Sequence, residues 1–183
     1  MNLRDNFIRL KAPSPAPALN LTGLNGKPVS LNAGDPVLLS FFRDAACPFC
    51  NVRIYELTKR HDELAAKGLR IIAIFASEPE AVKRFVLQRP RPFLVVADPQ
   101  HKLYEQYGIQ KSLAGKLKAI TTRIKTLIQG LRLVGLAGLN TNNMMPADFL
   151  IDGNGKIVEA HYGADAGDRI AFAEIDAFLK KQK

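Results

Sequence analysis

Short apolar runs alternate with stretches of helical periodicity over most of the chain. Continuous apolar runs predict buried strands at residues 37–42, 70–76 and 93–98. Apolar positions three or four apart predict the helices that follow them, at residues 48–68, 79–88 and 101–108. Such an alternation is typical of βαβ units on a largely parallel sheet, so the sequence predicts an α/β fold.

The two ends of the chain complete this arrangement. Near the start, two short apolar segments flank Asn25 and Gly26, a dipeptide that favours a tight turn and therefore predicts an N-terminal β-hairpin. Near the end, residues 147–163 predict two strands joined at residues 153–155, and residues 169–182 predict a closing helix with a basic last turn. The chain has 183 residues, and we expect one domain over residues 1–183.

Composition and charge narrow the classes of function. Hydrophobic residues make up 47% and charged residues 23% of the chain, as in an ordinary globular protein. No apolar run resembles a signal peptide or approaches the roughly 20 residues of a membrane span, so we expect a cytoplasmic location. The net charge of +9 favours acidic partners. Without repeats, an RNA-binding aromatic signature or zinc-finger spacing, we expect no nucleic-acid partner.

The only two cysteines of the chain, Cys47 and Cys50, lie in the stretch Cys-Pro-Phe-Cys, directly after the strand predicted at residues 37–42. Pro48 suits the first position of a helix, which places Cys47 at the helix N-terminus and turns Cys50 toward the core. The helix dipole lowers a thiol pKa there, and a second thiol one turn away can resolve a mixed disulfide formed at the first. In a reducing cytosol such a pair indicates catalysis, redox sensing or metal binding.

Three simpler interpretations compete with dithiol chemistry. The cysteines could serve as small hydrophobic residues of the core. A structural zinc ion needs about four ligands, and His61, His101 and His161 are too scattered to supply a second pair, so we expect neither a metal nor a cofactor. His61 lies on the apolar stripe of the helix predicted at residues 48–68, and we expect it to be a core histidine. A metal cluster shared between the cysteines of two subunits is a third interpretation, and no feature of the sequence supports it.

Four stretches cover most of the chain apart from residues 112–143: PALNLTGLNGKPVSL, VLLSFFRDAACPFC, ADPQHKLYEQYGI and MPADFLIDGNGKIVEAHYG. Together they resemble the alkyl hydroperoxide reductase / thiol-specific antioxidant family, the peroxiredoxin-like branch of the thioredoxin fold. The resemblance implies a central mixed sheet flanked by helices and an antioxidant thiol oxidoreductase. It also implies a peroxide or disulfide substrate and a reductant such as thioredoxin, glutaredoxin or glutathione.

Two positions depart from the peroxiredoxin pattern Pro-x-x-x-Thr/Ser-x-x-Cys, and a third departure lies before the late strand. If Cys50 takes the place of the peroxide-attacking cysteine, Arg43 replaces the proline and Cys47 replaces the Thr or Ser. Pro146 stands where those enzymes carry an arginine and where thioredoxin-like reductases carry a cis-proline, so the resemblance favours a cis bond before Pro146. Cys-Pro-Phe-Cys is also similar to the CPYC of glutaredoxins, with Phe49 in place of tyrosine.

These residues lead to the prediction of a dithiol that cycles between thiol and disulfide, with Cys47 as the attacking thiolate and Cys50 as the resolving thiol. Pro146 is predicted to lie beside them and to present the backbone of Met145 to the substrate, with Phe49 as a second binding residue.

Two arginines, Arg43 and Arg53, are candidate stabilisers of the thiolate, and both are explained equally well as solvated surface charges. Two other hypotheses of function stay open. In one, Cys50 is the peroxidatic residue, oxidised to sulfenic acid and resolved by Cys47. In the other, the dithiol is a non-enzymatic redox sensor whose basic helix binds a partner or a membrane.

The segment outside the resemblance predicts a helical insertion at about residues 111–140. It carries six basic residues and no acidic one. One amphipathic helix is predicted from the spacing of Leu113, Leu117, Ile120, Ile124, Leu127 or Ile128, and Leu131. Packing on the domain or a homodimer interface is the favoured interpretation, whereas binding to a membrane surface is not expected. Because the segment leads into Met145 and Pro146, a role as a lid or in substrate selection is a further hypothesis.

Overall fold

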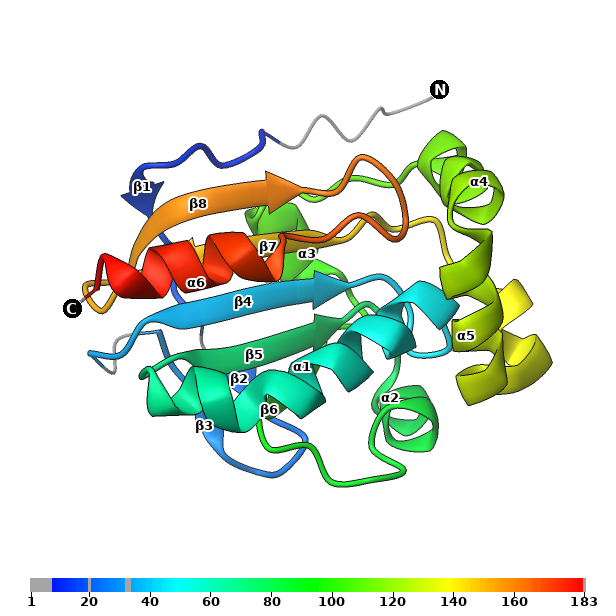
Figure 1. Cartoon of the computed structure of the whole chain (residues 1–183), viewed down its shortest axis with the longest axis horizontal. Coiled ribbons are helices and arrows are strands. Elements are labelled where there is room, and N and C mark those ends of the chain that lie inside the picture. The colour runs from blue at the N-terminus through cyan, green and yellow to red at the C-terminus, as the bar shows by residue number, and fades with distance from the viewer. Residues whose placement is uncertain (1–7, 20, 32–33, 183) are drawn as a thin grey trace.

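A mixed β-sheet of six strands forms the centre of the protein (Figure 1), of which the computed structural model describes residues 8–19, 21–31 and 34–182. The strands are β1 (Ser14–Pro15), β2 (Leu21–Thr22), β3 (Pro28–Val29), β4 (Val37–Phe42), β5 (Arg70–Phe75), β6 (Leu94–Ala97), β7 (Ala147–Ile151) and β8 (Lys156–Tyr162). The helices are α1 (Pro48–Ala66), α2 (Pro79–Phe85), α3 (Lys102–Gln106), α4 (Leu113–Thr122), α5 (Ile124–Val134), α6 (Phe172–Lys180) and the 3₁₀ helix η1 (Gly135–Leu139).

The sheet has the strand order β1-β8-β7-β4-β5-β6 and confirms the predicted α/β class. Strands β4, β5 and β6 run parallel, whereas β7, β8 and β1 extend the sheet in antiparallel fashion. All six residues of β4 are buried, as the continuous apolar run predicted for a central strand. The predicted N-terminal hairpin is also present, because β2 pairs antiparallel with β3 apart from the main sheet.

Two layers of side chains cover the sheet. Helices α1 and α6 lie on one face, and α3 lies behind the opposite face (Figure 1). Phe42, Ile54 and Phe178 belong to the core on the α1 and α6 side. On the other side Phe41, Tyr104 and the N-terminal segment form a second core. The sheet is therefore sandwiched between two hydrophobic layers, which leaves its carboxyl edge as the place where loops gather.

Helix α1 has the predicted limits. It begins at Pro48 with Cys47 as N-cap, and Gly68 beyond its end has a φ of +87°, a conformation that glycine adopts without strain. Most of the predicted inward stripe is buried, but the expectation that His61 is a core residue is wrong. His61 is half-buried and lies at the wall of a surface cavity, with its ring contacting the neighbouring Asp62 at 3.0 Å.

The insertion contains two α-helices and a 3₁₀ helix, so the prediction of one amphipathic helix is wrong. The break falls at Arg123, where the backbone leaves the helical region and the side chain binds the Asp165 carboxylate at 2.8 Å. The residues facing the domain are small: a Cβ added to Gly130 would lie 2.3 Å from the carbonyl oxygen of Pro48. Close approach of α5 to α1 therefore depends on glycine, while seven of the larger apolar residues of the insertion are exposed.

Candidate functional site

The two cysteines lie at the carboxyl end of β4, where the chain enters α1. Both are free thiols and both are buried, with 0% of Cys47 and 3% of Cys50 exposed. Asn51 in the first turn of α1 donates from its side chain to the carbonyl oxygens of Ala45 (2.7 Å) and Cys47 (3.1 Å). This clamp fixes the turn that holds Cys47 at the helix N-terminus, where the sequence placed it.

The two thiols have opposite pKa shifts. Burial by itself raises the pKa of Cys47, but a hydrogen bond from Cys50 and the positive charge of Arg43 more than offset this effect and lower the pKa to about 6. The pKa of Cys50 is raised well above its ordinary value by burial, by its hydrogen bond to Cys47 and by the negative charge there. Near neutral pH the pair therefore consists of a Cys47 thiolate and a Cys50 thiol.

Arg43 is the basic residue in direct contact with a sulfur atom. Its Nη1 donates to Cys47 Sγ at 3.3 Å, while Nε and Nη2 donate to the carbonyl oxygens of Met144 and Asn142, each at 2.5 Å. Asn142 returns a bond from its side chain to the carbonyl oxygen of Arg43 at 2.9 Å. Arg43 is thus a buried residue that ties the cysteine loop to the end of the insertion, and the interpretation as a solvated surface charge does not hold for it.

Arg53 is also buried, with 5% exposed, so the interpretation as a solvated surface charge is wrong for it too. Its Nη2 donates to the carbonyl oxygen of Ile170 at 2.8 Å, and its guanidinium carbon lies 4.1 Å from the centre of the Phe172 ring. The sequence missed Arg169, whose charge lowers the pKa of Cys50 and which pairs with the buried carboxylate of Asp148 at 2.6 Å. A signal for this pair was present, since a carboxylate inside an apolar strand rarely stays buried without a cation.

The expectation of a cis bond before Pro146 is wrong. Among residues 8–19, 21–31 and 34–182 the cis peptide bond is Ala12–Pro13, so Met145 and Pro146 are joined by a trans bond. This segment is paired with the start of the insertion, where the N–H of Met145 donates to the carbonyl oxygen of Gln110 at 3.0 Å. That N–H is therefore already engaged within the protein, and the substrate-binding roles of Met145 and Pro146 stay predictions.

A small cavity of about 70 Å³ separates the cysteine loop from the insertion. Arg43, Pro48 and Phe49 line it on the side of the cysteine loop. The insertion contributes Lys116, Ile120, Leu127, Gly138, Leu139 and Thr141. The insertion therefore faces Pro48 and Phe49, the two residues between the cysteines, and Phe49 lies where a molecule in this cavity would touch it.

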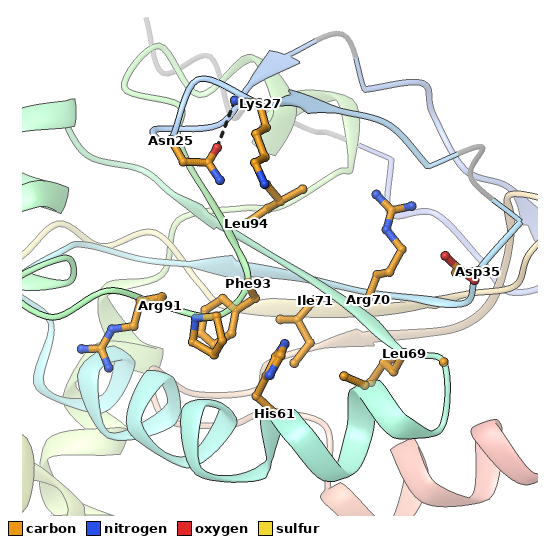
Figure 2. A pocket seen from close by; sticks show the side chains of 13 residues that line it. Asn25, Lys27, Asp35, His61, Leu69, Arg70, Ile71, Arg91, Phe93 and Leu94 are labelled. Carbon is orange, nitrogen blue, oxygen red and sulfur yellow. Dashed lines mark hydrogen bonds between the residues drawn. The ribbon is translucent and has the colours of Figure 1, made fainter.

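A larger cavity of about 610 Å³ lies at the other end of the sheet (Figure 2). Lys27, His61, Arg70, Phe93 and Leu94 are among the residues that line it, at the amino end of β5 and the far end of α1. No group of three or more His, Cys, Asp or Glu that could bind a metal occurs anywhere in the described part of the chain. Of the two cavities, the small one adjoins the cysteine loop, through Arg43, Pro48 and Phe49.

Comparison with known proteins gives a consistent result. A family model described as "AhpC/TSA family" matches residues 13–160. Peroxiredoxin Bcp of Escherichia coli is 33% identical over 123 residues, which are 65% of this chain and 79% of that protein. The crystal structure of peroxidoxin BcpB from Mycobacterium tuberculosis superposes with a TM-score of 0.68 at 17% identity, covering 96% of this chain and 99% of that one. A peroxiredoxin-like protein from Aquifex aeolicus has a TM-score of 0.64 at 18% identity, covering 96% and 90%.

Proposed function

Because the chain belongs to the AhpC/TSA family of thiol peroxidases and oxidoreductases, we propose that it reduces small hydroperoxides with a dithiol formed by Cys47 and Cys50. The observation that carries this proposal is the contrast within the pair. Cys47 has a pKa lowered to about 6 and contacts Arg43, whereas Cys50 keeps its proton. A ready nucleophile and a protonated second thiol are what a two-step reduction needs.

The first step forms a sulfur–oxygen bond at Cys47. Its thiolate attacks one oxygen of ROOH, the O–O bond breaks, and the leaving alkoxide takes a proton to depart as ROH. Cys47 is thereby oxidised by two electrons to the sulfenic acid. The guanidinium of Arg43 next to the sulfur would also stabilise the negative charge that develops on the leaving oxygen.

The second step closes a disulfide. The Cys50 thiol loses its proton, attacks Cys47 Sγ and displaces the hydroxyl group, which leaves as water. A thiol reductant, such as the dithiol of a thioredoxin or glutaredoxin or two molecules of glutathione, then returns two electrons by thiol–disulfide exchange and restores both cysteines. The spacing of one helical turn allows this disulfide without moving α1.

The sequence pattern and the electrostatics assign the attacking residue differently. The peroxiredoxin pattern places Cys50 at the peroxidatic position, whereas the thiolate lies at Cys47, at the helix N-terminus and beside Arg43. Because the thiolate is the nucleophilic form, we assign the attack to Cys47. The enzyme class of the family favours turnover over the hypothesis of a non-enzymatic sensor.

The burial of both sulfur atoms restricts the size of the substrate that can reach them. A cavity of about 70 Å³ has room for a molecule of roughly two water volumes, since one water occupies about 30 Å³ in the liquid. Hydrogen peroxide or a very small organic hydroperoxide fits this space. A protein disulfide would need the insertion to move away from Cys47, so peroxide is the better substrate for the arrangement described.

Single variants of the two cysteines test the assignment. Cys47→Ser should abolish peroxide consumption, whereas Cys50→Ser should still consume about one equivalent of peroxide and then stall with a sulfenic acid on Cys47, identified by dimedone trapping and peptide mass spectrometry. A sulfenic acid on Cys50 in the Cys47→Ser variant, with continued peroxide consumption, would reverse the two roles. Retention of full turnover by both variants would refute the dithiol mechanism.

A further inference from the structure

Large apolar side chains are exposed on α4, α5 and η1, and the exposed side of these three helices is called the outer surface of the insertion. Seven of the ten exposed large apolar residues in the described part of the chain lie there, each at least 48% exposed. They are Leu113, Leu117, Ile124, Ile128, Leu133, Leu136 and Leu139. So dense an apolar surface is uncommon on a soluble domain and marks a site of interaction.

Packing against the domain does not account for these residues. The buried positions of the insertion are Gly115, Ala119, Gly130, Val134 and Gly138. Gly130 allows close approach to the backbone of Pro48, and Gly115 and Gly138 leave room for the side chains of Met145 and Pro48. The small residues thus serve the contact with α1 and the cysteine loop. The seven larger apolar residues remain exposed, which suggests that they contact another molecule or surface.

The charge of the same surface restricts what that partner is. Between Glu105 and Asp148 the chain has six basic residues and no acidic one. Lys116 and Arg123 bind groups within the protein, at the carbonyl oxygen of Thr141 and the carboxylate of Asp165. The exposed basic residues that remain are Lys111, Lys118, Lys125 and Arg132.

We propose that the outer surface of the insertion docks on an anionic lipid bilayer. Leucine and isoleucine interleaved with lysine and arginine match the acyl region and the phosphate groups of such a surface. A second copy of this chain using the same surface would instead bring two sets of positive charges face to face, which opposes association. No helix in residues 8–19, 21–31 and 34–182 is long and apolar enough to cross a bilayer, so the contact would be interfacial.

The position of the insertion suits such docking. Helices α4 and α5 form one end of the molecule, beyond the carboxyl ends of β4 and β5 (Figure 1). A planar surface can therefore reach them without meeting the sheet or α6. The inference does not depend on the proposed dithiol chemistry, because Leu139 alone among the exposed residues that it uses lines the cavity beside Phe49.

Flotation with lipid vesicles tests the proposal on the full chain. We expect binding to vesicles of equal parts phosphatidylglycerol and phosphatidylcholine, weakened by added salt, and little binding to vesicles of phosphatidylcholine alone. Lys118→Gln/Lys125→Gln/Arg132→Gln should lower the affinity by more than about tenfold. Leu117→Gln/Ile128→Gln/Leu136→Gln should lower it comparably by removing the inserted apolar area.

A matched control variant distinguishes the effect of the basic residues on the insertion from the effect of the protein's overall positive charge. Lys83→Gln/Lys156→Gln/Lys180→Gln removes the same charge from exposed sites outside the insertion and should leave vesicle binding unchanged. Circular dichroism establishes that each variant is folded. Equal losses in the two charge variants, or no binding of the wild-type chain to anionic vesicles, would overturn the proposal. The proposal would also be overturned, in favour of a protein interface, if the wild-type chain bound no vesicles but formed a concentration-dependent dimer. In that case Leu117→Gln/Ile128→Gln/Leu136→Gln should dissociate the dimer.

Discussion

The Nη1 atom of Arg43 lies 3.3 Å from Sγ of Cys47, and both side chains are withdrawn from solvent, with 1% and 0% exposed. The other guanidinium nitrogens donate to the carbonyl oxygens of Asn142 and Met144, so the charge cannot turn away from the sulfur. An interaction of this kind is stronger than a similar contact at the surface, because little water screens it. The low pKa of Cys47 therefore depends on a contact between the cysteine loop and the end of the insertion.

Replacing Arg43 should make Cys47 a poorer nucleophile. In Arg43→Gln the positive charge is lost while burial and the hydrogen bond from Cys50 remain, so the pKa of Cys47 should rise from about 6 toward its ordinary value. The rate of alkylation by iodoacetamide at neutral pH should fall by about tenfold or more. Arg53→Gln serves as the control and should react like the wild type, because Arg53 binds Ile170 and Phe172. Equal effects of the two variants would contradict the assignment.

The reactivity of Cys47 should titrate well below the range of an ordinary thiol. Its alkylation rate should rise through an apparent pKa of about 6 and level off above it. The pKa of Cys47 is lower in the folded protein than in the unfolded chain, where it is about 9. Ionised Cys47 therefore stabilises the folded state, and this contribution is complete at pH values above about 9 and is lost as the pH falls through about 6. Urea denaturation under reducing conditions should therefore show Cys47→Ser losing more stability, relative to wild type, at pH 8 than at pH 6. A difference independent of pH would contradict the shift.

The fold was largely predictable because its patterns are local. Periodicity located the strands and helices of the sheet, and Pro48 and Gly68 marked the ends of α1. The helix N-terminus at Cys47 followed from the same residues. What failed was the packing of the insertion, because a stripe of apolar residues normally faces the core as a whole. Here Gly130 lets α5 approach Pro48. Leu127 packs against the core, while Ile124 and Ile128 are exposed. Apolar spacing alone does not say which side of a helix packs.

The sequence allowed the roles of the two cysteines to be predicted, but not the residues that surround them in the fold. Asn142 and Met144 meet Arg43 across about a hundred positions of sequence, and no local pattern encodes such a contact. Arg169 was missed for the same reason, because it approaches Cys50 from a loop before α6. The cis-proline expectation rested on a resemblance at one position, whereas Met145 is paired here with Gln110, a contact that no local pattern encodes.

Breaking the buried pair of Asp148 and Arg169 should cost far more stability than breaking a surface pair. Asp148 is fully buried and accepts bonds from Ser40, Arg169 and the N–H of Ile170. Asp148→Asn leaves the Arg169 charge buried without its partner, which should lower the free energy of unfolding by about 3–5 kcal/mol. Asp176→Asn makes the same chemical change at a residue that pairs with Lys67 nearer the surface, and should cost at most about 1 kcal/mol. Chemical denaturation of the two variants measures the difference, and similar losses would refute it.

The size of the cavity beside Phe49 should limit which hydroperoxides react. Leu127 lines this cavity from α5, so Leu127→Ala should enlarge it and admit a bulkier substrate. The ratio of kcat/KM for cumene hydroperoxide to that for hydrogen peroxide should rise by about tenfold. Leu133→Ala removes the same atoms from a side chain of α5 that points outward and should leave the ratio unchanged. If both variants leave the ratio unchanged while Leu127→Ala remains folded, hydroperoxides reach Cys47 by another path, and the insertion does not select the substrate.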